Sequence, residues 1–152
     1  MKINKAELVD RIKKMFKKAI VDGVEHIFIY YTGWSCFPTG NWMLVEHEDY
    51  RNDKIEDNRI SFADLMDAAR SADYSKSLDI TCDCSFSGEW AHTAKSHFES
   101  HKEKFQVYVN PVCSRDSLAG VGSFRNDLRV DDTSYKYTFG STSYHNGTFS
   151  EF

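Results

Sequence analysis

The sequence predicts an α/β protein with a largely parallel sheet, and three observations lead to this expectation. Apolar strand-like runs alternate along the chain with segments whose apolar residues recur at helical spacing. The run over residues 27–31 lacks the polar–apolar alternation of a half-exposed strand, which favours a strand buried on both faces of a parallel sheet. The 152 residues are 41% apolar, enough for one core without disulfide staples, so we expect a single domain over 1–152.

The first expected element is a helix over residues 5–21. Asn4 followed by Glu7 predicts its N-terminal cap. One face is apolar, with residues at helical spacing: Leu8, Val9, Ile12, Met15, Phe16, Ala19 and Ile20. The basic residues of the other face predict a solvated surface, with an acidic partner as the alternative.

The later elements continue the alternation. Strands are expected at 27–31, 42–45, 78–82 and 105–109, and helices from Ser61 onward and over 89–101. Asn110-Pro111 should stop the last of these strands, because proline donates no backbone hydrogen bond. In the tail, residues 135–139 alternate like an edge strand.

Composition excludes several classes of function. A net charge of -4 gives no general attraction to nucleic acid, and no apolar run approaches the roughly 18 residues that would span a bilayer. We therefore expect a cytoplasmic protein with no nucleic-acid or membrane partner. The four scattered cysteines predict reduced thiols, and no Gly-rich phosphate loop is visible. His97 and His101 have the spacing of two metal ligands but lack a third, so neither a metal nor a cofactor is expected.

Two segments that follow predicted strands resemble a known pair of catalytic motifs. The first reads YTGW over residues 31–34, and the second reads DCSFSG over residues 83–88. They resemble the two catalytic corners of the caspase and metacaspase cysteine proteases, Tyr-Ser-Gly-His-Gly and Asp-x-Cys-x-Ser-Gly. Trp34 stands at the position of the family's general-base histidine and Ser85 at that of its nucleophilic cysteine. The two positions are 51 residues apart, close to the roughly 50 that separate these residues in caspases.

The resemblance implies a caspase-like three-layer αβα sandwich, here without the family's first two strands and last helix. It also implies that Asp83 binds substrate. The segment over 121–126 is similar to the Ser-Trp-Arg-Asn of metazoan caspases, which would give Arg125 a carboxylate-binding role; the alternative is an ordinary surface arginine. With no strand beyond it, the strand over 27–31 would be an open edge. We expect this edge to pair with another chain or with the tail strand over 135–139.

The substitutions argue against protease chemistry. A cysteine protease needs a thiolate beside a base, but indole is not basic and nothing obvious activates the hydroxyl of Ser85. The sequence therefore predicts an inactive caspase-like module for binding, regulation or scaffolding. Its partner would be a protein or peptide, such as another caspase-like chain or a second copy. Trp34 is expected to fill the former cleft or to pack over the carboxyl-terminal edge of the sheet, with ligand recognition as the alternative.

Two other hypotheses remain open. One is a hydrolase with relocated catalytic residues, using Cys84, with His92 as an imported base, or Ser85. Cys82 and Cys84 share one side of the predicted strand, which favours buried structural cysteines instead. The other is a fragment without independent function.

Overall fold

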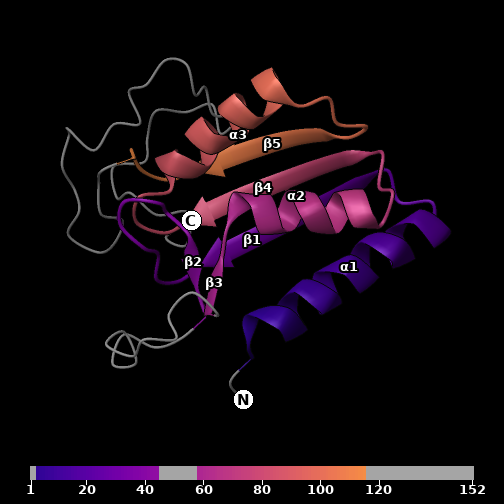
Figure 1. Cartoon of the computed structure of the whole chain (residues 1–152), viewed down its shortest axis with the longest axis horizontal. Helices are drawn as coiled ribbons and strands as arrows, with labels where there is room; N and C mark the ends of the chain where they lie inside the picture. Colours follow the sequence, from indigo (N-terminus) through magenta and orange to yellow (C-terminus); the bar gives the residue numbers. More distant parts are fainter. Residues whose placement is uncertain (1–2, 45–57, 116–152) are drawn as a thin grey trace.

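A computed structural model of the chain describes residues 3–44 and 58–115. Its elements, in order, are α1 (Lys5–Val21), β1 (His26–Thr32), β2 (Trp42–Met43), β3 (Arg59–Ile60), α2 (Phe62–Ser71), β4 (Ser77–Asp83), α3 (Gly88–Ser100) and β5 (Gln106–Pro111), as shown in Figure 1. Arg125 and the predicted tail strand over 135–139 lie outside the described residues, as does most of the segment over 46–59, whose polar and acidic sequence predicts a solvated excursion.

The helices begin where side-chain capping was predicted. The Asn4 side chain accepts the Glu7 N–H at 2.9 Å, and α1 ends at Val21 as expected. At the start of α2, Ser61 and Asp64 form a reciprocal capping box. Both caps satisfy backbone N–H groups that have no partner within the helix, so these starts are fixed by local chemistry.

The sheet is parallel, and its order is β1-β4-β5. This confirms the predicted α/β class with a parallel sheet; β2 and β3 form a separate antiparallel pair. β5 ends at Pro111, so the strand stops at the predicted dipeptide, although it includes both of its residues and runs two residues beyond the expected bound. Among the described strands, β5 has a neighbour, β4, on one side alone. A proline nitrogen that faces the other side breaks no hydrogen bond of the sheet, so proline is tolerated here.

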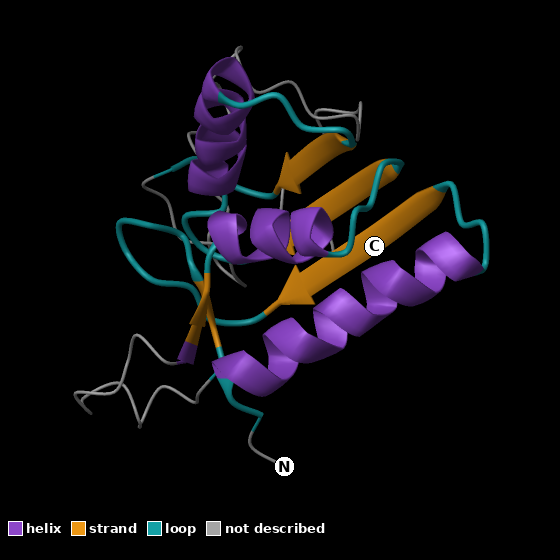
Figure 2. Ribbon diagram, turned by 45° about the vertical axis from the view of Figure 1, so that its right-hand side comes forward, coloured by secondary structure: helices purple, strands orange, loops and turns teal. Residues whose placement is uncertain are grey.

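All three described helices contribute to one core on one face of this sheet. The core includes Phe16 of α1, Leu65 of α2 and Trp90 of α3, and Figure 2 shows the helices against the strands. Each crossover steps in the same direction across the sheet, and right-handed crossovers of that kind place their helices on the same face. The second helical layer of a three-layer sandwich is not seen among the described residues. None of the described helices is long and apolar enough to cross a membrane.

The prediction that the strand over 27–31 is buried on both faces was wrong. Ile27 faces the helices and is buried, whereas the side chains of Phe28 and Tyr30 are 58% and 44% exposed. The continuous apolar run concealed this alternation because aromatic residues can stand on a solvated face. As expected, β1 is an edge of the described sheet, with β4 as its neighbour.

Candidate functional site

The two corners lie side by side at the carboxyl end of the sheet. β1 and β4 are neighbours in parallel register, and their last residues, Thr32 and Asp83, are paired. Beyond the strands, the Ser35 hydroxyl donates a hydrogen bond to the Ser85 carbonyl. Segments about 50 residues apart in sequence therefore meet where open α/β sheets usually hold their ligands.

In the first corner, the residues that match the family motif hold the backbone. The Tyr31 hydroxyl lies 2.5 Å from the Trp34 carbonyl and 3.0 Å from the Met43 carbonyl, and it accepts the Met43 N–H at 3.2 Å. Burial of this hydroxyl raises the pKa of Tyr31 well above its usual range, so it stays protonated. Gly33 has a φ of 153°, and a Cβ there would lie 2.8 Å from the Tyr31 hydroxyl. Tyr31 and Gly33 thus shape the turn.

In the second corner, the matching residues Ser87 and Gly88 also hold the backbone in place. Ser87 is fully buried, and its hydroxyl accepts the N–H groups of Val112 and Cys113 at 3.1 and 3.2 Å. A Cβ on Gly88 would lie 2.7 Å from the Arg115 nitrogen. The Ser-Gly pair therefore fastens the start of α3 to the segment that follows β5. Its match to the motif reflects architecture, independent of catalysis.

At the two positions that would carry chemistry, the side chains are an indole and a hydroxyl. The Trp34 side chain is 59% exposed, so one of its two expected placements, filling the cleft, was wrong. The interior below is occupied by Tyr31 stacked on Trp42, with ring centroids 4.5 Å apart. The same loop carries a second exposed aromatic, Phe37, which packs edge-on against Phe86. Sequence reasoning missed Phe37, although an aromatic residue in a Gly/Pro-rich loop is a usable signal.

Cys84 is badly placed for catalysis. Its side chain is 2% exposed, and burial raises the pKa of its thiol far above the usual range, with the neighbouring Cys113 adding to the effect. The other groups that act on this thiol are the Ser35 hydroxyl and the Asp83 carboxylate. A buried thiol with a raised pKa is a poor nucleophile at neutral pH. The structure thus opposes relocation of catalysis to Cys84 and favours the buried structural cysteine.

We expect the thiols to be unreactive in the folded protein. All four cysteines lie outside disulfides and are buried, and burial raises the pKa values of Cys82, Cys84 and Cys113. With iodoacetamide at pH 7.5, each should be alkylated at least about tenfold more slowly than in the urea-unfolded chain, because thiolate formation requires opening. Peptide mass spectrometry gives the four rates. Preferential labelling of Cys84 over Cys36 and Cys113 would contradict this and revive the relocated nucleophile.

The predicted substrate residue Asp83 points to the sheet face that the described helices leave open. Its buried carboxylate accepts a hydrogen bond from the Tyr30 hydroxyl at 2.7 Å. Partial burial and this carboxylate raise the pKa of Tyr30 to about 12. Four residues earlier on β4, Asp79 pairs with His26. Asp83 is thus held in place at the corner, whereas the other predicted substrate residue, Arg125, lies outside the described residues.

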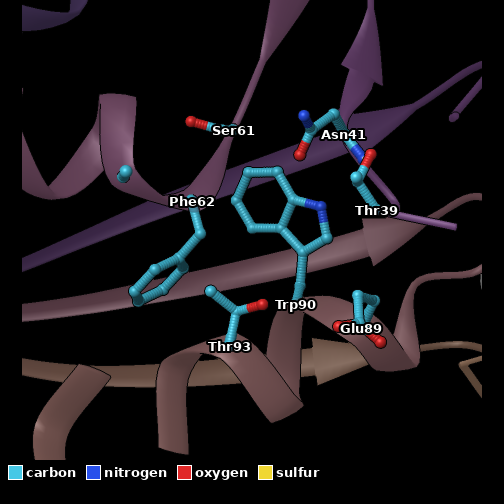
Figure 3. Close-up of a pocket in the computed structure, with 8 residues that line it drawn as sticks. Thr39, Asn41, Ser61, Phe62, Glu89, Trp90 and Thr93 are labelled. Carbon is cyan, nitrogen blue, oxygen red and sulfur yellow. The ribbon is translucent and has the colours of Figure 1, made fainter. Parts of the chain in front are cut away.

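A separate pocket of about 230 Å³ opens on the helix side (Figure 3). Its lining comes from the loop after the first corner and from the starts of α2 and α3: Thr39, Asn41, Ser61, Phe62, Ala63, Glu89, Trp90 and Thr93. Three of its polar groups already have structural partners. Ser61 caps α2, Glu89 pairs with Arg115 at 2.6 Å, and the Trp90 indole donates to the Gly40 carbonyl at 2.7 Å. The pocket also offers the aromatic side chains of Phe62 and Trp90.

The histidine pair on α3 is part of a structural contact. His97 stacks on His101 with ring centroids 4.5 Å apart, and its Nε2 lies 2.8 Å from the Glu103 carboxylate, which also binds Arg70. Among the described residues, no group of three or more His, Cys, Asp or Glu side chains is placed to hold a metal ion.

The chain matches no protein-family model, and a search of curated proteins finds no similar one.

Proposed function

We propose that this chain is a catalytically inactive caspase-like domain that binds a protein or peptide partner at the joined strand corners. One observation carries the proposal. The corners meet through the Ser35–Ser85 hydrogen bond, but the paired positions present an exposed indole at Trp34 and a hydroxyl at Ser85. The residues that shape the turns match the family, and the residues that would cleave a peptide are replaced.

The finer architecture belongs to the same proposal. A three-layer caspase-like sandwich without its first two strands would leave β1 as an edge, which agrees with the described strand order. The missing strands would also explain why α1, α2 and α3 share one face, because a doubly wound sheet gains its second layer where the strand order reverses.

The mode of binding follows from what the corner exposes. Trp34 and Phe37 offer two large aromatic side chains on one loop, and aromatic anchors carry much of the energy of protein interfaces. The adjacent edge strand β1 offers backbone donors and acceptors to an added strand. An extended peptide segment fits both features, since it can pair along β1 and place a side chain against Trp34.

A hydrolase centred on Ser85 is the second candidate. Ser85 is partly exposed whereas Cys84 is buried, so Ser85 is the more accessible of the two alternative nucleophiles. Its hydroxyl would still need a base, and Trp34 at the facing corner supplies none.

Extended peptides selected from a displayed library on the immobilised protein should bind without being cleaved. The library should include peptides with acidic and with basic residues at internal positions. We expect Trp34→Ala to weaken binding of the selected peptides about tenfold or more, the usual loss for an aromatic anchor. Calorimetry measures the affinity, and mass spectrometry of the same peptides after prolonged incubation measures cleavage.

Tyr108→Ala is the matched control, because Tyr108 is a comparably exposed aromatic on the opposite edge strand, β5. Its affinity should stay within about twofold of the wild type. Equal losses from Trp34→Ala and Tyr108→Ala, or no loss from either, would place binding elsewhere. Cleavage that disappears in Ser85→Ala or Cys84→Ala would overturn the inactive assignment in favour of the hydrolase.

A further inference from the structure

Two buried cysteines meet where the second corner contacts the segment after β5. The Cys113 thiol donates a hydrogen bond to the carbonyl oxygen of Cys84, and the sulfur lies 3.3 Å from that oxygen. The two residues are 29 positions apart in sequence, and both side chains are buried. The proposed function uses neither thiol.

The strand register brings the two backbones to the spacing of a disulfide. Cys82 of β4 is the register partner of Pro111 of β5, and the Val112 N–H donates to the Cys82 carbonyl at 3.3 Å. Cys84 and Cys113 each lie two residues beyond this pair. Neighbouring strands are about 4.8 Å apart, within the Cα separation of roughly 4.4–6.8 Å that disulfides span. The contact between the Cys113 thiol and the Cys84 carbonyl keeps the two residues adjacent past the end of β5.

The two side chains also lie on the same side of the sheet. Cys84 belongs to the core that the helices cover. The Cys113 sulfur lies 3.4 Å from the hydroxyl oxygen of Ser87, which is the residue directly before α3. Two cysteines on adjacent strands can be joined only when their Cβ atoms do not point apart, and this pair meets that condition.

We propose that Cys84 and Cys113 form an oxidative modification site, a dithiol that converts to a disulfide and back. The oxidant is a small disulfide, represented by oxidised glutathione. One cysteine thiolate attacks a glutathione sulfur and releases one reduced glutathione; the other cysteine thiolate then attacks the mixed disulfide and releases the second. The protein loses two hydrogen atoms, which end on the two glutathione thiols, while one S–S bond breaks and one forms.

Burial makes this reaction slow and dependent on opening of the structure. It raises the pKa of both thiols, so the attack starts from molecules in which the corner has opened locally. Brief exposure to the oxidant should therefore leave the dithiol intact. Sustained oxidising conditions, or folding under them, should give the disulfide.

The disulfide would control how readily the second corner opens. Ser85 directly follows Cys84, and the Ser87 hydroxyl already accepts the Cys113 N–H at 3.2 Å. A covalent link would replace the hydrogen bond between the Cys113 thiol and the Cys84 carbonyl, and local opening does not break a covalent bond. This consequence rests on the fold alone and holds whether or not a peptide binds at the corners.

Redox equilibration of the full chain tests the pair. The protein is held in mixtures of reduced and oxidised glutathione, folded and in urea, until reduced and oxidised starting material give the same products. Acid then traps the products, and peptide mass spectrometry maps them. We expect a Cys84–Cys113 disulfide whose equilibrium constant is at least about thirtyfold higher in the folded protein than in the unfolded chain, because a link that fits the native structure stabilises it.

Matched variants keep or remove the pair. Cys36→Ala combined with Cys82→Ala retains Cys84 and Cys113 and should leave the equilibrium constant close to that of the wild type. Cys84→Ala and Cys113→Ala should each lose the folded-state product. In the oxidised wild type, the amides of residues 83–88 should exchange at least about tenfold more slowly than in the reduced wild type. The wild-type measurements keep the proposal testable if a variant does not fold.

Three results would overturn the proposal. The first is an equilibrium constant no higher in the folded protein than in the unfolded chain, which would mean that the native geometry strains the link. The second is a folded-state disulfide between another pair, such as Cys82 and Cys84. The third is equal hydrogen exchange over residues 83–88 in the oxidised and reduced protein, which would remove the control of the corner.

Discussion

Replacing Trp90 by alanine should lower the free energy of unfolding by about 3–5 kcal/mol, the usual cost of deleting a buried tryptophan. Its side chain is 1% exposed and stacks on Trp42, with ring centroids 4.2 Å apart and planes 11° from parallel. Phe62 meets it edge-on at 6.0 Å. The indole N–H donates to the Gly40 carbonyl at 2.7 Å, a buried acceptor that alanine would leave without this partner.

The loss extends beyond one cavity because Trp90 belongs to an aromatic column that joins both corners. Trp42 also stacks on Tyr31 of the first corner, while Trp90 lies in the first turn of α3, which follows the second corner. Removing Trp90 should therefore loosen the first corner against α3. Faster hydrogen exchange in the loop over 32–41 would report this.

Urea denaturation measures the stability change. Trp90→Phe keeps an aromatic ring but loses the hydrogen bond to Gly40. We therefore expect it to lower the free energy of unfolding by a smaller amount, about 1–2 kcal/mol. This variant keeps the prediction testable if the alanine variant does not fold. Phe37→Ala, at an exposed aromatic, should change stability by no more than about 0.5 kcal/mol. A loss below about 1 kcal/mol for Trp90→Ala would contradict the column as a support of the site.

The parts of the fold that sequence predicted best depend on local chemistry. The Asn4 cap and the Ser61–Asp64 box involve residues three apart, so their side chains and backbone partners can be read from the sequence. The number of layers depends on strand order, which is a property of the whole chain. Continuous apolar character therefore could not tell a strand with two buried faces from β1, where Phe28 and Tyr30 are exposed.

The candidate site also combines features that could be predicted from the sequence with features that could not. The meeting of the two corners was predictable, because parallel neighbouring strands end at the same edge. The exposure of Trp34 was not, because it depends on Tyr31, Trp42 and Trp90 filling the interior from three distant segments. Nor did the motif reveal that Ser87 satisfies backbone groups after β5, since that contact crosses 26 residues.

Introducing a cysteine and a histidine at the two corner positions should create a reactive thiol. In Ser85→Cys combined with Trp34→His, a thiol and an imidazole would occupy the joined corners. An imidazolium within reach stabilises the thiolate, so the pKa of the new thiol should fall from about 8.5 to about 7 or below. The native cysteines are buried, so alkylation at position 85 should dominate. At pH 6, alkylation should be at least tenfold faster in the double variant than in Ser85→Cys alone.

The pH dependence follows from the direction of this pKa change. A thiol with a lowered pKa is ionised at pH values where an ordinary thiol is not, so the advantage of the double variant should lie between about pH 6 and pH 8. It should disappear above about pH 9, where both thiols are ionised. Ser85→Cys combined with Tyr108→His is the matched control, because it places an imidazole at an exposed aromatic position on β5, at the opposite edge of the described sheet from β1. This control should alkylate like Ser85→Cys alone.

The alkylation rate at position 85, measured at pH 6 with and without Trp34→His, tests the central claim most directly. If the corners form the outline of a cysteine-protease site whose chemistry has been replaced, the histidine should accelerate labelling at least tenfold. Equal rates in Ser85→Cys and in the double variant would contradict the claim that Trp34 and Ser85 occupy the paired positions of such a site.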